Sequence, residues 1–261
     1  MTTAIRPLAL VTGASSGIGR EMAVELAARD YDLVIAAEDG DLAAVGEGAT
    51  HSGASVVSVT ADLATDAGVE KLVAEVEGLG RPVDILCLDA GFGNAGPFIE
   101  TPPEQDLRLI ALNIDHVVHT AKRLLPAMVQ RGQGRVLITS SVAALMPGPW
   151  YATYAASKAF LQSFAEAVRY ELKDTGVTVT ALLPGPTDTD FFERANLDGT
   201  VAEEGPKDDP KEVARDGLEA MFDGKDQVVA GSWRNKVQAV LRKGGPDSLK
   251  ATVHAQQTKQ K

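Results

Sequence analysis

The sequence predicts a doubly wound α/β fold, in which helices cover both faces of one parallel sheet. Short apolar segments alternate with longer segments that carry apolar residues at helical spacing, and strands separated by helices in this way pair in parallel. A glycine-rich turn joins the first apolar segment to the first helix, and 261 residues suit one large α/β core. We therefore expect a single domain over residues 1–231.

The candidate strands are seven apolar segments: Leu8–Thr12, Leu33–Ala37, Ser55–Thr60, Asp84–Leu88, Gly134–Thr139, Val177–Leu183 and Gln227–Ala230. Helical spacing of apolar residues predicts helices that begin at Gly17 and that span residues 41–51, 66–79, 102–131, 154–173 and 210–222. Two prolines follow the sixth strand and form a rigid turn. The polar segment over about residues 187–209 then suits a lid over a bound ligand.

Composition favours small-molecule chemistry. A net charge of −11 and a pI near 4.9 disfavour nucleic acid, whose binding needs lysine and arginine to neutralise phosphates. The single cysteine, Cys87, lies in an apolar segment and is expected to be buried, which fits a reducing cytoplasm. We find neither a cleavage pattern near the N-terminus nor an apolar segment long enough to span a membrane, so we expect a cytoplasmic protein.

The glycine-rich turn runs from Thr12 to Gly19, with glycines at 13, 17 and 19. Glycine permits a close backbone approach, and the start of the following helix presents unpaired N–H groups and a positive dipole end that suit a diphosphate. It is not a P-loop, because no Gly-Lys-Ser/Thr closes it. The turn is therefore a candidate dinucleotide-binding site.

The second strand ends at Glu38-Asp39-Gly40. In a dinucleotide-binding fold this position faces the adenosine ribose, where an acid accepts hydrogen bonds from the hydroxyls and an arginine would bind a 2′-phosphate. Ser16, the other place for a basic residue, is uncharged. These residues favour NAD(H) over NADP(H), although Glu38 and Asp39 would also suit the start of a solvated loop.

Tyr154 and Lys158 lie four residues apart in a predicted helix, so they share one face. A fixed positive charge beside a phenol lowers its pKa, and a tyrosine tuned in this way can move protons near neutral pH. For an isolated Tyr-x-x-x-Lys, a packed ring and a solvated lysine would be the simpler interpretation. Here Ser141 stands thirteen positions before Tyr154, and a dinucleotide turn is present in the same chain.

With these motifs together, the chain resembles the short-chain dehydrogenase/reductase family over about residues 5–231. Thr-Gly-x-x-x-Gly-x-Gly at 12–19 matches the family's cofactor turn, Ser141, Tyr154 and Lys158 match its catalytic set, and Asn113 matches its helix asparagine. The resemblance implies a Rossmann-type seven-stranded parallel sheet and a nicotinamide cofactor. It also implies homodimers or homotetramers built through helices 102–131 and 154–173.

The resemblance implies an oxidoreductase that interconverts an alcohol and a ketone or aldehyde. Tyr154 would be the acid/base, Lys158 would lower its pKa and hold the nicotinamide ribose, Ser141 would bind the substrate oxygen, and Asn113 would position water in a proton relay. The cofactor-binding residues would be Gly13, Ser15, Ser16, Gly17, Ile18, Gly19, Glu38, Asp62, Leu63, Asp89, Ala90, Gly91, Tyr154, Lys158, Pro184, Gly185, Thr187 and Thr189. The alternative is a non-catalytic nucleotide-sensing or scaffold protein on the same fold.

Two residues depart from the family pattern. Asp89 replaces the first residue of the family's Asn-Ala-Gly, which removes a hydrogen-bond donor unless the acid is protonated. We expect this change to weaken the bracing between strands and to affect nothing catalytic. Thr187 stands where valine is common in the family. Because the family uses mainly the backbone there, we expect the cofactor contact to persist.

Two histidines, His116 and His119, lack a third ligand at suitable spacing, so we expect no metal site and interpret both as surface or interface residues. The walls of the substrate pocket are expected to be apolar and to include residues 146–150, Phe191 and Phe192. The substrate itself is not predicted.

The segment 232–261 carries seven Lys or Arg residues and one acidic residue, in contrast to the rest of the chain. Its first part is expected to form a basic helix with four apolar residues on one face: Trp233, Val237, Val240 and Leu241. Two interpretations are open, contact with an anionic membrane surface or packing on the body or a partner subunit, and we favour the second. The last dozen residues are expected to be disordered.

Overall fold

Seven parallel strands form one sheet in the order β3-β2-β1-β4-β5-β6-β7. The structure is a computed structural model that describes residues 6–38, 42–191, 195 and 205–231. The strands are β1 Leu8–Thr12, β2 Asp32–Ala37, β3 Val56–Thr60, β4 Val83–Leu88, β5 Gly134–Thr139, β6 Val177–Leu183 and β7 Gln227–Val229. The order reverses between β1 and β4, and ligands of open α/β sheets bind at such a switch point, outside the carboxyl ends of the strands.

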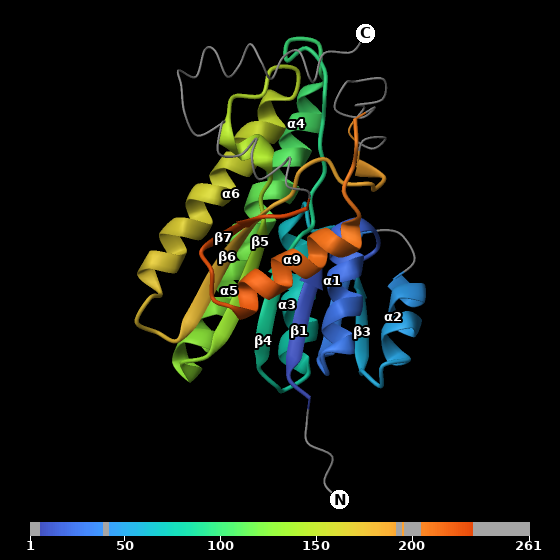
Figure 1. Ribbon diagram of the computed structural model, residues 1–261, viewed down its shortest axis with the longest axis vertical. Coiled ribbons are helices and arrows are strands. Elements are labelled where there is room, and N and C mark those ends of the chain that lie inside the picture. The colour runs from blue at the N-terminus through green and yellow to red at the C-terminus, as the bar shows by residue number, and fades with distance from the viewer. Residues whose placement is uncertain (1–5, 39–41, 192–194, 196–204, 232–261) are drawn as a thin grey trace, which may run out of the picture.

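Helices cover both faces of the sheet, which confirms the predicted doubly wound α/β fold. They are α1 Gly17–Ala28, α2 Leu42–Thr50, α3 Asp66–Gly78, α4 Pro103–Ile110, α5 His116–Arg131, α6 Ala152–Glu171 and α9 Pro210–Phe222. One apolar layer packs α1, α2 and α9 on the sheet, and the other packs α3, α5 and α6. Figure 1 shows α9 and α1 in front of the strands.

The predicted strand limits agree closely with the structure. β1, β5 and β6 have the predicted bounds, and each of the other four strands differs by one residue at one end. Buried positions on successive residues of β1 and β2 explain this accuracy, because a strand covered on both faces is a continuous apolar segment with clear ends. Cys87 is fully buried within β4, as expected.

The chain is helical from Pro103 to Arg131, close to the predicted segment 102–131, but it is not α-helical throughout. A π-helical turn at Ala111–Asp115 separates α4 from α5, and Asn113 lies at its centre. The Asn113 side chain reaches across to Phe92, in the loop after β4, and bonds both backbone polar atoms of that residue. Single π turns inside helices are frequent at functional sites. Asn113 is thus the local reason for this π-helical turn.

The interpretation of His116 as a surface or interface residue is wrong, because its side chain is fully buried between α5 and the end of β1. Its Nδ1 lies 2.7 Å from the Leu112 carbonyl oxygen and its Nε2 lies 3.2 Å from Thr12 Oγ1. A carbonyl only accepts, so Nδ1 carries the proton and Nε2 accepts from the Thr12 hydroxyl. Burial lowers the pKa of His116 to about 4, which keeps the ring neutral.

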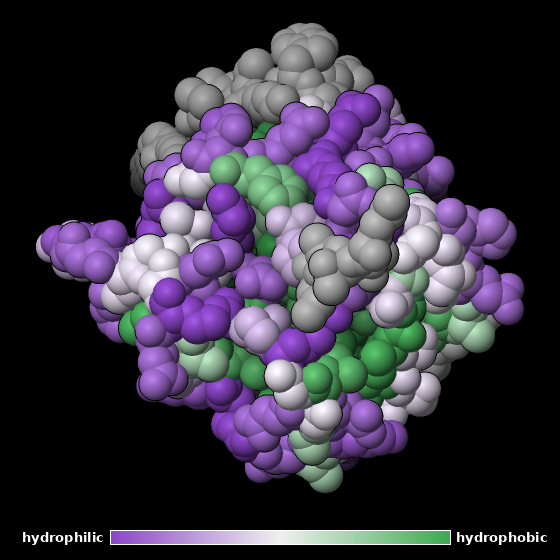
Figure 2. All heavy atoms as spheres, turned by 90° about the horizontal axis from the view of Figure 1, so that it is seen from below, coloured by the Kyte–Doolittle hydropathy of each residue, from purple (hydrophilic) through white to green (hydrophobic). Residues whose placement is uncertain are grey.

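The amino ends of the strands carry paired charges. Arg6 lies 3.2 Å from Asp30, and Arg81 lies 2.6 Å from Asp32 at the start of β2. Figure 2 views the molecule from this end and shows hydrophilic side chains over much of the face, with apolar patches between them. None of the helices formed by the described residues is long and apolar enough to cross a membrane.

Candidate active site and cofactor site

The glycine-rich turn lies against the segment that follows β4. Gly13 has φ +72°, and a Cβ placed there would lie 2.8 Å from backbone atoms of Ala90. A Cβ at Gly19 would lie 2.4 Å from the Gly13 carbonyl oxygen. Both glycines are therefore required for this close packing of backbone on backbone. The turn brings the predicted residues of loop 13–19 beside those of 89–91.

The start of α1 is open to an anion. Its N-cap residue is Ser16, whose side chain makes no capping hydrogen bond, and no acidic residue lies in the first turn. The first N–H groups of a helix have no partner within the helix, and the dipole there is positive. Ser15 lies in the turn before α1, and Ile18 packs against the apolar layer of α1 and α2. These features fit a dinucleotide diphosphate.

The segment 89–91 is held by backbone hydrogen bonds to the side chain of Thr12, at the end of β1. The N–H groups of Asp89 and Ala90 donate to Thr12 Oγ1 at 3.1 and 3.2 Å, while the hydroxyl proton of Thr12 goes to His116. His116 is a part of the site that sequence reasoning missed. Its position three residues after Asn113, on the same helical side, was the available signal.

The Asn113 side chain is fully engaged. Its Nδ2 donates to the Phe92 carbonyl oxygen at 3.0 Å and to Ser157 Oγ at 3.1 Å, and its Oδ1 accepts from the Phe92 N–H at 3.1 Å. A Cβ at Gly91 would lie 2.9 Å from Asn113 Oδ1 and 3.5 Å from Lys158 Nζ. Asn113 therefore fixes the loop that borders Lys158. Its predicted part in a water relay stays a prediction.

The structure brings Ser141, Tyr154 and Lys158 together where β5 meets α6. Lys158 Nζ lies 5.8 Å from the centre of the Tyr154 ring and donates to the Thr139 carbonyl oxygen at 2.9 Å. Ser141 caps the short helical turn Val142–Leu145, and its Oγ accepts from the Ala143 N–H at 3.1 Å. A hydrogen bond between Ser141 and Tyr154 lowers the pKa of the tyrosine.

Burial nevertheless raises the pKa of Tyr154 to about 12, against the opposing effect of Ser141. The net shift is therefore upward, whereas a lowered pKa was expected from the sequence, and the effect of Lys158 on Tyr154 stays a prediction. The reason for the upward shift is the environment of both groups. The Tyr154 ring is covered by Phe191 and Tyr151, at centroid distances of 5.2 and 5.6 Å, and burial also lowers the pKa of Lys158 to about 8.

Asp89 follows β4, and its side chain bonds Thr139 at the end of β5. One carboxylate oxygen accepts from Thr139 Oγ1 at 2.5 Å, so the expected weakening of strand bracing does not occur. Burial raises the pKa of Asp89, which Thr139 and the charge of Lys158 oppose. The carboxylate in turn raises the pKa values of Lys158 and Tyr154. Asp89 thus acts on the candidate catalytic pair, which the sequence interpretation did not anticipate.

The adenosine end of the site contains one cation that sequence reasoning missed. Glu38 follows β2 and Asp62 follows β3, and Arg108 of α4 forms ion pairs with both. Leu63, the residue after Asp62, is buried in the apolar core. Asp39 lies outside the described residues. Glu38 and Asp62 thus follow their strands as expected, and each is paired with Arg108.

The segment after β6 closes over the glycine-rich turn. The Pro184 carbonyl oxygen accepts from the Val142 N–H at 3.0 Å, next to Ser141. Thr187 is buried and its hydroxyl donates to the Gly185 carbonyl oxygen at 3.0 Å, while the predicted backbone contact to a cofactor stays a prediction. A Cβ at Gly17 would lie 3.0 Å from Thr189 Cγ2.

The predicted lid is described only in part, and Phe192 lies outside the described residues. Phe191 and Ala195 pack on Gly93, and the Ala95 N–H donates to the Ala195 carbonyl oxygen at 2.9 Å. This segment covers Tyr154, which is 8% exposed.

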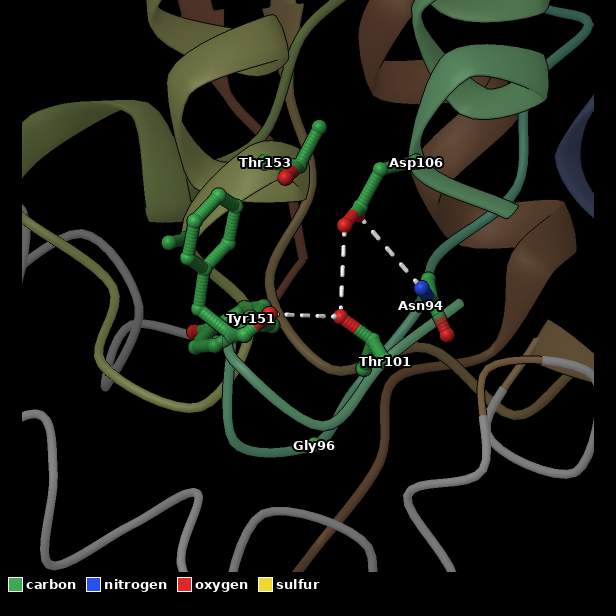
Figure 3. Close-up of a pocket in the computed structure, with 8 residues that line it drawn as sticks. Asn94, Gly96, Thr101, Asp106, Tyr151 and Thr153 are labelled. Atoms are coloured by element: carbon green, nitrogen blue, oxygen red, sulfur yellow. Dashed lines mark hydrogen bonds between the residues drawn. The ribbon is translucent and has the colours of Figure 1, made fainter. Parts of the chain in front are cut away.

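A small pocket beside Tyr151 is lined by residues other than the expected walls of the substrate pocket, so the apolar walls stay a prediction. Figure 3 shows Asn94, Thr101 and Asp106 converging on it. Asp106 accepts from Thr101 Oγ1 at 3.2 Å. Among the described residues, no group of three or more His, Cys, Asp or Glu side chains is placed to hold a metal ion.

A family model described as short chain dehydrogenase matches residues 7–199. The chain belongs to the short-chain dehydrogenase family. The relatives that the chain matches include proteins named as dehydrogenases or oxidoreductases. An uncharacterised short-chain type dehydrogenase/reductase, y4eK of Sinorhizobium fredii, is 36% identical over 191 residues, which cover 72% of this chain and 73% of that protein.

Other family members differ in length. The probable oxidoreductase EphD of Mycobacterium tuberculosis is 37% identical over 192 residues, but the match spans 70% of this chain and 31% of EphD. A short chain dehydrogenase of Pseudocercospora fijiensis is 32% identical over 186 residues, which span 70% of this chain and 60% of that protein. The chain therefore corresponds to only part of these relatives.

Solved structures of the family have the same fold. A short-chain dehydrogenase from Sphingobium yanoikuyae in complex with NADPH superposes with a TM-score of 0.80 at 30% identity, over 85% of this chain and 87% of that one. A 7β-hydroxysteroid dehydrogenase has a TM-score of 0.84 at 24% identity, over 95% and 96% of the two chains, and supports the fold alone.

Proposed function

We propose that the chain interconverts an alcohol and a ketone or aldehyde, with Tyr154 as the acid/base. The observation that carries this proposal is the buried cluster of Ser141, Tyr154 and Lys158 beside the open N-terminus of α1. A bound nicotinamide supplies or accepts the hydride. In reduction the Tyr154 hydroxyl gives its proton to the carbonyl oxygen, and in oxidation the phenolate takes the proton from the alcohol.

Each neighbour of Tyr154 has a defined part. Ser141 donates a hydrogen bond to the substrate oxygen, where negative charge develops. Lys158, as an ammonium, stabilises the phenolate that forms when Tyr154 gives up its proton. Because the pKa of Tyr154 is about 12, the phenol is protonated at neutral pH. This state suits carbonyl reduction more than alcohol oxidation. Asn113 fixes the bordering loop and positions water for proton return to Lys158.

The predicted cofactor-binding residues act from several segments that meet at the carboxyl ends of the strands. Loop 13–19 binds the diphosphate, residues 89–91 border it, and residues 184–189 contact the nicotinamide half. Glu38 accepts hydrogen bonds from the adenosine ribose and repels a 2′-phosphate, so the site prefers NAD(H) to NADP(H). Asp62 and Leu63 lie beside the adenine.

We further propose a homodimer or homotetramer built through α4, α5 and α6, acting in the cytoplasm on a small alcohol or carbonyl compound. Exposed apolar side chains on these helices support such an interface, since Leu107 of α4 is 64% exposed and Phe160 of α6 is 41% exposed. The basic segment 232–261, for which packing on the body or a partner was expected, lies outside the described residues.

The test is a panel of ketones and aldehydes followed by loss of nicotinamide absorbance, with wild type, Tyr154→Phe and Tyr170→Phe compared. Tyr170 lies on the same helix but is 70% exposed, so its variant is the matched control. We expect Tyr154→Phe to bind cofactor normally and to lose about 100-fold or more in rate. Unchanged turnover in Tyr154→Phe, or binding of cofactor with no turnover of any substrate by wild type, contradicts the proposal.

A further inference from the structure

Arg108 joins the two acids at the adenosine end of the site. Its Nη2 lies 2.6 Å from Glu38 Oε2 and 3.2 Å from Asp62 Oδ1, and its Nη1 lies 3.0 Å from Asp62 Oδ2. The pair with Asp62 thus uses both guanidinium nitrogens, and Glu38 shares one of them. The three residues come from α4, the end of β2 and the segment after β3.

The charges of these residues change how Glu38 selects a cofactor. Two carboxylates and one guanidinium leave a single net negative charge, rather than the two expected from the acids alone. The Asp62 hydrogen bonds raise the pKa of Arg108, so the guanidinium is charged at all relevant pH values. A cation is therefore already present beside the position of the ribose 2′-group.

The contacts are also easy to rearrange. The side chains of Arg108 and Glu38 are 42% and 53% exposed, and ion pairs between groups this exposed contribute little to stability. A phosphate carries more charge than one carboxylate and accepts two parallel hydrogen bonds from a guanidinium. Glu38 competes for the guanidinium that such a phosphate would bind.

We propose that Arg108 is a specificity-determining residue, and that Glu38 disfavours NADP(H) partly by holding this guanidinium. Glu38 thus acts in two ways, by repelling the 2′-phosphate and by occupying its cation. Removing the charge of Glu38 releases one Nη2–H of Arg108 for the phosphate, while the contacts of Arg108 to Asp62 remain. This inference rests on the proposed function, because it places the adenosine ribose at the end of β2.

The experiment is a titration of NADH and NADPH, followed by protein fluorescence, for wild type, Glu38→Gln, Arg108→Leu and the double variant. We expect Glu38→Gln to bind NADPH at least about tenfold more tightly than wild type does, since hydrogen bonds to charged groups contribute a free energy of this size. The double variant loses most of that gain, while Arg108→Leu changes NADH affinity by less than about threefold. In the Glu38→Gln background, Arg108→Lys keeps part of the gain, because an ammonium still attracts a phosphate.

The control is Arg123→Leu. Arg123 is 37% exposed and also bridges two acids, Glu70 and Glu77, but these join α3 to α5. It should leave both affinities unchanged. If the double variant keeps the gain in NADPH affinity, the inference is overturned. It is also overturned if Arg108→Leu loses affinity for NADH and NADPH equally. Failure of wild type to bind either cofactor overturns the proposed function together with it. Normal turnover with unchanged NADPH binding in Glu38→Gln overturns the inference alone.

Discussion

The amino ends of the strands form one border of the sheet, the amino edge, and the carboxyl ends form the other, the carboxyl edge. Both edges carry many charges, but the charges are arranged differently. At the amino edge several arginines pair with one acid, as in Arg81 with Asp32 at 2.6 Å and Arg131 with Asp84 at 3.5 Å. At the carboxyl edge the charges are shared or buried. Glu38 and Asp62 share Arg108, and buried Lys158 donates to a backbone carbonyl instead of a carboxylate.

This difference separates stability from function. A charge paired one to one near the surface has its interactions complete in the folded protein. A buried charge without a full partner has a shifted pKa, as Lys158 and Tyr154 have, and such shifts are typical of functional sites. Substitutions at the carboxyl edge should therefore lower the turnover rate, and substitutions at the amino edge should lower the free energy of unfolding.

The largest expected effect is that of Lys158→Met at the carboxyl edge. Removing the buried ammonium takes away the charge that stabilises the Tyr154 phenolate, so the turnover rate should fall about 100-fold or more. Initial rates of carbonyl reduction measure this effect. Lys173→Met is the control, because Lys173 is exposed just beyond α6 and its ammonium lies over the Tyr170 ring. A similar loss in both variants would remove the distinction between buried and exposed lysines.

The next effect is expected at the amino edge, in Asp32→Asn. Asp32 is 7% exposed, pairs with Arg81 and accepts from the Ser55 N–H at 2.9 Å. Its loss of charge should lower the free energy of unfolding by about 1–3 kcal/mol, with turnover per folded molecule unchanged. Urea denaturation followed by circular dichroism measures the stability.

Asp223→Asn is the matched control for that variant. Asp223 pairs with Lys225 at 3.0 Å, but both side chains are more than half exposed, so the change should stay within about 0.5 kcal/mol. If Asp32→Asn reduced turnover as much as stability, the two edges would not be separable in the way proposed.

The smallest effect is a shift in pH dependence in Asp89→Asn. The Asp89 carboxylate raises the pKa of Lys158, which burial lowers to about 8. Without the negative charge the ammonium loses its proton at lower pH. The alkaline limb of the pH profile of carbonyl reduction should move down by about one unit. A limb that moves to higher pH, or that stays in place, would show that Asp89 does not act on Lys158.

The sequence predicted the features that depend on local pattern. Buried strands have clear ends, and the motifs of Gly13 to Gly19 and of Tyr154 with Lys158 need only short spacings, so both were found. The missed features depend on distant residues. Arg108 is 70 positions from Glu38, and His116 is 104 positions from Thr12, so neither partner is visible in a local pattern.

The sign of the Tyr154 shift was missed for a related reason. A helical spacing of four shows that Lys158 is near, but it does not show how deeply both groups are buried. Of the two residues that cover the ring, Tyr151 caps the same helix, but Phe191 comes from the segment after β6. Where a charge effect and burial oppose each other, the packing decides the outcome, and packing is a property of the whole fold.

The central claim, that the carboxyl edge carries out hydride transfer with Tyr154 as the acid, is tested most directly by isotope transfer. NADH or NADPH labelled with deuterium at the transferable position is incubated with the best carbonyl substrate of the panel, and the product alcohol is analysed by mass spectrometry. We predict deuterium on the carbinol carbon with wild type and at least about 100-fold less labelled alcohol with Tyr154→Phe. Alcohol without deuterium, or equal labelling by both proteins, would contradict the account.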